Sequence, residues 1–95
     1  MAVRNVRYYI DPETDLPHIY NHQVSEEEVE QVLAMPGEDR QGEEGSRVAI
    51  GQTEAGRYIR VIYAPDPNPG SVFVITAYEL HGKALTAYRR RRHKR

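Results

Sequence analysis

Histidine is the side chain in this sequence best suited to acid–base chemistry. The chain carries four histidines and no cysteine, which removes disulfides, thiolate metal sites and cysteine nucleophiles together. Cleaving a phosphodiester without a metal requires a base, an acid and positive charge on the phosphate. Histidine, with a reference pKa near 6.5, serves in either proton-transfer role. His22, just before a capped helix start, is therefore the first catalytic candidate; the alternative is a surface histidine that only links two elements.

His18 and His22 stand four residues apart, a spacing that could place both rings on one helical face for a metal ion. No third ligand accompanies them in a recognised pattern, so the sequence predicts no metal site. The chain also lacks a Ser-His-Asp order, a glycine-rich phosphate loop and a dinucleotide fingerprint. We therefore expect no cofactor.

A second candidate group follows from strand alternation, which places successive side chains on opposite faces of a sheet. If Val48, Ile50, Ile59, Val61, Tyr63, Phe73, Ile75 and Ala77 face the core, the open face gathers Arg47, Tyr58, Arg60, Thr76 and Tyr78. Arginines and tyrosines on one sheet face could hold phosphates and stack bases, as in single-stranded RNA recognition. We predict catalytic roles for Arg47, Arg60 and Tyr78 and substrate contacts for Tyr58 and Thr76. The alternative is an ordinary solvated face.

Helix-capping residues and turn-forming residues predict the helices and strands that position these side chains. Residues 3–10 predict a strand, and Ser25 with Glu28 forms a capping box for a helix that ends near Met35. Residues 36–46 read as a polar loop. Strands are expected at 47–52, 57–64 and 72–78, and a second helix at 82–92. This β-α-β-β-β-α order predicts an α+β fold, a small antiparallel sheet with both helices on one face.

Charge divides the chain into an acidic and a basic part. Residues 11–45 hold eleven acids against one arginine, a formal charge of −10, whereas residues 89–95 hold six Lys/Arg and one His. We expect a single domain over residues 1–88, followed by a basic tail at 89–95 that extends past the core. Tyr88, Arg89, Arg90 and Arg91 would then contact RNA phosphates, although an acidic protein partner or simple solubility would explain the same charge.

Two further features bear on location. No apolar run approaches the roughly 20 residues needed to span a bilayer, and the start lacks a signal-peptide pattern. We therefore expect a cytoplasmic protein that does not enter a membrane.

Several short motifs resemble the BrnT-type toxins. Residues 21–28 (NHQVSEEE) resemble their K-H-G-V-S-x-E-E segment, and Asp11-Pro12 resembles their W-D-P with Ile10 in place of Trp. Glu44 to Gly51 resembles their E-x-R…I-G stretch. Residues 74–78 (VITAY) occupy the place of their I-S-A-R strand end, and match more closely a sister group of small uncharacterised domains ending V-I-T-V-Y.

This resemblance implies a RelE-like fold, ribonuclease activity and a cognate antitoxin partner, with His22 at a family position. Tyr78 stands where the toxins carry an arginine. Two hypotheses follow: a toxin-like, metal-independent endoribonuclease that binds RNA and an antitoxin, or a non-catalytic interaction module of the same fold. Losing a cation that stabilises the transition state would cost orders of magnitude in rate, and this motivates the second hypothesis.

Overall fold

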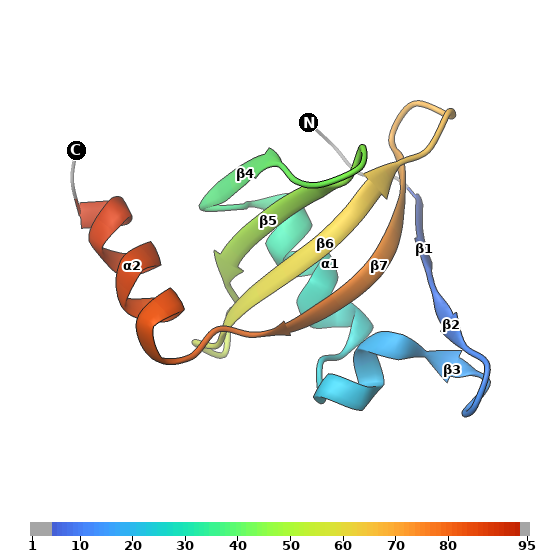
Figure 1. Ribbon diagram of the computed structural model, residues 1–95, viewed down its shortest axis with the longest axis horizontal. Helices are drawn as coiled ribbons and strands as arrows, with labels where there is room; N and C mark the ends of the chain where they lie inside the picture. The colour runs from blue at the N-terminus through green and yellow to red at the C-terminus, as the bar shows by residue number, and fades with distance from the viewer. Residues whose placement is uncertain (1–4, 94–95) are drawn as a thin grey trace.

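The computed structural model describes residues 5–93 as an α+β domain (Figure 1). Its elements are β1 (Asn5–Tyr8), β2 (Ile10–Asp11), β3 (Leu16–Pro17), the 3₁₀ helix η1 (His18–His22), α1 (Glu26–Ala34), β4 (Glu38–Gln41), β5 (Arg47–Gln52), β6 (Tyr58–Pro65), β7 (Ser71–Glu79) and α2 (Gly82–His93). The predicted α+β class is confirmed. Between residues 5 and 93, no helix is long and apolar enough to cross a membrane.

Five strands form the main sheet in the order β1-β7-β6-β5-β4, and β2 and β3 form a separate short ladder. The expected antiparallel meander of β5, β6 and β7 is confirmed. The expectation of a wholly antiparallel sheet is wrong, because β1 pairs with β7 in parallel. Strands β1 and β7 lie far apart in the sequence, so no hairpin between them sets the direction in which they pair. The sheet also gains β4 from residues expected to form a loop.

Helix α1 forms as the capping box predicts. The amide of Glu28 donates to Ser25 Oγ at 3.1 Å, and the amide of Ser25 donates to Glu28 Oε1 at 3.0 Å. The helix buries Val29, Val32 and Leu33 against one face of the sheet, where Ile59, Val61 and Val74 belong to the same core cluster. Apolar residues at helical spacing thus select the face that α1 covers.

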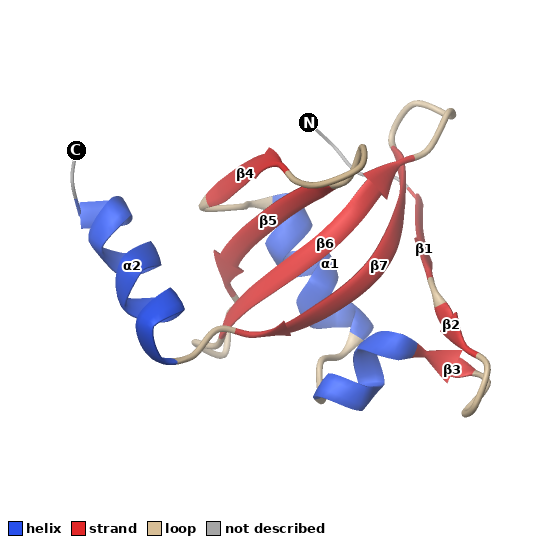
Figure 2. Cartoon of the chain, viewed as in Figure 1, coloured by secondary structure: helices blue, strands red, loops and turns tan. Residues whose placement is uncertain are grey.

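Helix α2 packs on the opposite face, so the expectation of both helices on one face is wrong. Tyr88 and Leu80 bury themselves with Val48 and Ile50, and Leu85 packs beside them. Strand β5 is buried on both sides, and the apolar residues that face away from α1 need a cover of their own. Figure 2 shows α1 crossing behind the sheet and α2 standing to one side of it.

A β-bulge in β7 changes which residues face the core. Val74 pairs with Tyr63, whereas Thr76 pairs with Ile62, so Ile75 is one residue too many for the ladder. The extra residue reverses the alternation across the bulge. Val72 and Val74 therefore face α1, and the prediction that Phe73 and Ile75 face the core is wrong, whereas Ala77 does lie in the core cluster.

Candidate active site at the edge of β7

The helix η1 carries two histidines to the edge of β7. Pro17 occupies the position before its first residue, and Gln23 ends it in a left-handed conformation with φ of 59°. Ile19 is fully buried and anchors the helix to the core. Strand β1 pairs with β7 as far as Val74, and η1 lies beside the rest of that edge, which no strand among residues 5–93 covers (Figure 1).

Four rings form a row along this edge. The centroids of His18 and His22 lie 5.2 Å apart with their planes at 74°. The His22 ring lies 5.9 Å from that of Tyr78, and the His18 ring lies 6.1 Å from that of Tyr9. The structure therefore brings together His22 and Tyr78, two of the predicted catalytic residues, and adds His18, whose ring lies between those of Tyr9 and His22.

Asp11 orients the His18 ring. Its Oδ2 lies 3.2 Å from His18 Nδ1 and accepts from Asn21 Nδ2 at 2.6 Å, while Oδ1 accepts from the amide of Glu13 at 2.8 Å. The Glu13 amide, followed by the Asn21 side chain, lowers the pKa of Asp11 and keeps it ionised at neutral pH. A carboxylate at Nδ1 favours the tautomer with the proton there, which leaves Nε2 of His18 free to accept a proton.

Arg60 and Thr76 lie on the same sheet face as Tyr78. Arg60 is the cross-strand partner of Tyr78, and Thr76 belongs to the next pair on that face. Arg60 Nε and Thr76 Oγ1 are both buried, and neither has a hydrogen-bond partner among residues 5–93. Burying a polar group without a hydrogen-bond partner is costly. These two atoms therefore have hydrogen-bonding capacity that the described residues do not satisfy.

The placement of Arg47 on this face is wrong. Arg47 pairs with Tyr63 on the α1 side, and its Nε lies 3.0 Å from Asp39 Oδ1. Tyr63 donates to the other Asp39 oxygen at 2.7 Å, and burial together with that carboxylate raises the pKa of Tyr63 to about 12. Alternation misassigned β5 because its central residues are apolar on both faces, which leaves the pattern without a polar side.

The remaining residues that were predicted to contact RNA lie in α2 or pack against it. The Arg89 guanidinium lies 5.8 Å from the centroid of the Tyr58 ring, and Arg90 is exposed. Tyr88 is buried beneath the helix, and Arg91 forms an ion pair with Glu38. The expected free arm is thus wrong for residues 89–93, which continue α2 and contact β4 and the loop before it; Lys94 and Arg95 lie outside the described residues.

A family model described as Domain of unknown function (DUF4258) matches residues 19–79. The chain belongs to this family. The DUF4258 match contains His22, Arg60, Thr76 and Tyr78, whereas Asp11, His18 and all of α2 lie outside the matched residues. No curated protein and no solved structure matches the chain. The resemblance to BrnT-type toxins stays a prediction.

Sequence reasoning considered His18 only as a metal ligand and missed it as a partner of His22 in this DUF4258 protein. Its spacing from His22 was a usable signal, as was Asp11 at the turn before it. Within residues 5–93, no group of three His, Cys, Asp or Glu side chains is placed to hold a metal ion. The arrangement is instead suited to moving protons, because two imidazoles meet and a carboxylate orients one of them.

Proposed function

We propose that this protein is a metal-independent endoribonuclease that cleaves single-stranded RNA at His18, His22 and Tyr78. The observation that carries the proposal is the contact of two imidazole rings, 5.2 Å apart, with Asp11 behind one and Tyr78 beside the other. Two proton carriers at one exposed edge satisfy the requirement for a base and an acid. The site lies at the surface, where a flexible strand can reach it.

The chemistry divides between the two histidines. Nε2 of His18 takes the proton from a ribose 2′-hydroxyl, and the 2′-oxygen then bonds to the adjacent phosphorus. The bond from phosphorus to the 5′-oxygen breaks, and a protonated His22 gives its proton to that oxygen. The products are a 2′,3′-cyclic phosphate and a 5′-hydroxyl. Asp11 holds the His18 ring in its orientation and stabilises the imidazolium that forms on it.

Arg60 supplies the positive charge in this proposal. Tyr78 occupies the position where the similar toxins carry an arginine, and Arg60 lies directly across from it on the neighbouring strand. A cation on β6 can therefore serve the phosphate that an arginine on β7 would otherwise contact. Tyr78 would then hold the base or ribose by ring contact, as aromatic residues do in many RNA-binding sites.

Incubation with a labelled single-stranded RNA, with and without a metal chelator, tests the proposal. Cleavage should persist in the chelator and yield a cyclic-phosphate end. His18→Ala and His22→Ala should each lower the rate by about 100-fold or more, the usual contribution of a general acid or base. His81→Ala is the matched control, because His81 is exposed before α2 and is not one of the rings in contact at this site. Equal cleavage by His22→Ala and His81→Ala would reject the enzyme.

The non-catalytic module is the second candidate, and the tyrosine at position 78 favours it. In that case the protein binds RNA or a protein partner without cleaving it. Binding of RNA that survives intact through a long incubation, with no cyclic phosphate, would support this alternative. A protein partner such as an antitoxin stays a prediction of the toxin resemblance, and a cytoplasmic location stays a prediction of the sequence analysis.

A further inference from the structure

A second candidate site lies about α2, on the same side of the sheet as Arg60. A cavity of about 520 Å³ opens between α2, the loop after α1 and the beginning of β6. Its lining includes Tyr58, Tyr88, Arg89, Arg92 and His93. The volume falls within the roughly 300–1,000 Å³ typical of ligand pockets. Nothing in the proposed acid–base chemistry uses this cavity.

The charge of the cavity selects an anion. Arg89, Arg92 and His93 occupy one face of α2, at the spacing that places helical side chains together. Among the lining residues, all in the described part of the chain, none carries a carboxylate. Arg92 is held in place because its Nη1 donates to the carbonyl of Gly37 at 2.8 Å. Its other guanidinium nitrogens can still serve a ligand.

The aromatic content of the cavity narrows the anion to one that carries a flat ring. The Tyr58 and Tyr88 rings lie 6.0 Å apart in an edge-to-face arrangement, and the Arg89 guanidinium lies over Tyr58. Nucleic acid bases stack on tyrosine rings and on guanidinium planes, while nearby cations hold the phosphates. An acidic peptide would use the charges but not the stacking surfaces, so a nucleotide is the better fit.

The sheet connects this cavity to the candidate active site. Tyr58 and Arg60 are alternate residues of β6 and therefore share a face, at a separation of roughly 7 Å. Arg60 is paired with Tyr78, and Tyr78 contacts His22. A row of tyrosines and arginines thus runs across the sheet from α2 to η1. A single extended strand of RNA can follow such a row.

We infer that the cavity beside α2 binds one nucleotide of a single-stranded RNA, a short distance along the strand from the bond that is cleaved. The inference rests on the proposed function for the direction of the strand. Its own content is the site: Tyr58 stacks the base, and Arg89, Arg92 and His93 hold the phosphate. The cavity therefore adds affinity, whereas His18 and His22 add rate.

Binding of a fluorescent 2′-O-methyl RNA octamer tests this site without cleavage, because the methyl group blocks the attacking hydroxyl. Arg89→Gln should weaken binding several-fold, and the slope of log K against log salt should flatten by about 0.7, the value for one lost phosphate contact on a single strand. Tyr58→Leu keeps an apolar side chain against the cluster beneath α2 (Val48, Ile50, Leu80 and Tyr88). It should nevertheless weaken binding by at least about fivefold, since stacking on one base is worth at least about 1 kcal/mol. Arg90→Gln is the matched control.

The outcomes separate this inference from the proposed function. If Arg90→Gln weakens binding as much as Arg89→Gln, only the general charge of α2 matters and the site is wrong. If a polyglutamate peptide binds and the octamer does not, the cavity serves an acidic protein, and the inference is overturned. His81→Ala, which changes neither site, should bind the octamer like the native protein. Normal binding by a protein that never cleaves RNA would reject the enzyme and leave the nucleotide site standing.

Discussion

The two faces of the sheet differ in how completely the protein uses its own side chains. On the face covered by α1, a large cluster is buried, and seven of its members have no exposed surface: Val29, Val32, Ala49, Ile59, Val61, Val74 and Ala77. On the other face, the cluster beneath α2 is small, and two buried polar atoms on that face, Arg60 Nε and Thr76 Oγ1, have no hydrogen-bond partner within residues 5–93. The first face supplies stability, whereas the second leaves two buried polar atoms without a hydrogen-bond partner among the described residues.

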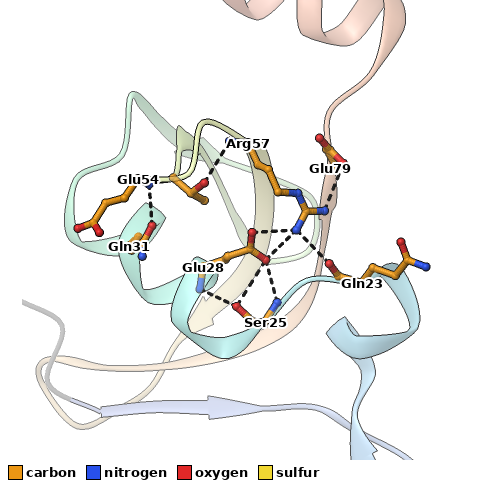
Figure 3. A network of polar contacts seen from close by, with 8 residues as sticks. Gln23, Ser25, Glu28, Gln31, Glu54, Arg57 and Glu79 are labelled. Carbon is orange, nitrogen blue, oxygen red and sulfur yellow. Dashed lines mark hydrogen bonds and ion pairs between the residues drawn. The ribbon is translucent and has the colours of Figure 1, made fainter.

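Polar groups at the margin of the α1 face are satisfied by one another (Figure 3). Arg57 donates from Nη1 to both Glu28 oxygens at 2.8 Å and to the Gln23 carbonyl at 3.0 Å, and from Nη2 to Glu79 at 3.2 Å. Gln23 is the residue that ends η1, and Arg57 directly precedes β6. This network therefore joins α1, β7 and the turn before β6 to the helix that carries the histidines. The covered face thereby also positions the candidate site.

The largest expected effect compares an isoleucine on each face. Ile59→Ala removes a side chain with no exposed surface from the α1 face, and should lower the free energy of unfolding by about 2–5 kcal/mol. Ile62→Ala, on the half-buried opposite face, should cost clearly less, about 1–2 kcal/mol. Urea unfolding followed by circular dichroism measures both. Equal losses would mean that the two faces contribute alike, contrary to the comparison.

A second test perturbs only the α2 face. A Cβ on Gly37 would lie 1.9 Å from the hydroxyl of Tyr88, so Gly37→Ala should displace α2 and cost about 1–3 kcal/mol. Tyr88→Phe removes that oxygen. The double variant Gly37→Ala/Tyr88→Phe should therefore regain part of the loss, and a double-mutant cycle by urea unfolding measures the coupling. Additive losses would show that the clash is not the cause.

Elements with a local signal in the sequence could be predicted, whereas elements set by pairing between distant segments could not. The capped helix α1 and the β5–β6–β7 meander were predictable because each has a local signal: Ser25 with Glu28 for the helix, and turn residues between the strands. The polar strand β4 was not, since it joins the sheet through backbone pairing that side-chain alternation does not report. The bulge at Ile75 was equally silent, because one inserted residue leaves no mark in composition.

The candidate site was predictable in part for the same reason. His22, Arg60, Thr76 and Tyr78 were recognised by residue type and strand alternation, and β6 places Arg60 where alternation put it. Arg47 failed because β5 is apolar on both faces. The contact between Asp11 and His18 depends on a turn that brings β2 and β3 together, and pairing across such a turn is a tertiary feature.

Acid should weaken the network on the α1 face. Burial would raise the pKa of Glu28, but the amide of Ser25 and the Arg57 guanidinium outweigh it and hold the pKa below its ordinary value of 4.5. A carboxylate with a lowered native pKa stabilises the fold above its unfolded pKa, and this stabilisation is lost as pH falls through the native value. Glu28→Gln should thus be less stable by about 1–2 kcal/mol at pH 7, with the gap to the native protein narrowing below about pH 4.5.

Thermal unfolding across pH 3–7 checks this expectation. Glu27→Gln is the matched control, because Glu27 lies in the same first turn of α1 and is exposed. Its curve should run parallel to that of the native protein. A Glu28→Gln curve that stays parallel as well would show that Arg57 gains nothing from the charge of Glu28.

The smallest expected effect concerns the ion pair that ties α2 to β4. Arg91 lies against Glu38, and this guanidinium is the main cause that lowers the pKa of Glu38. Both side chains retain contact with solvent, so the pair should contribute at most about 1 kcal/mol, and less in high salt. Arg91→Gln should therefore lower the free energy of unfolding slightly in low salt, and the difference from the native protein should vanish near 1 M salt. Arg90→Gln, one residue away and exposed, should show no such salt-dependent loss. A loss for Arg91→Gln that persists in high salt would mean that the α2 face depends on a dry, specific contact there, and the contrast between the two faces would be smaller than their burial indicates.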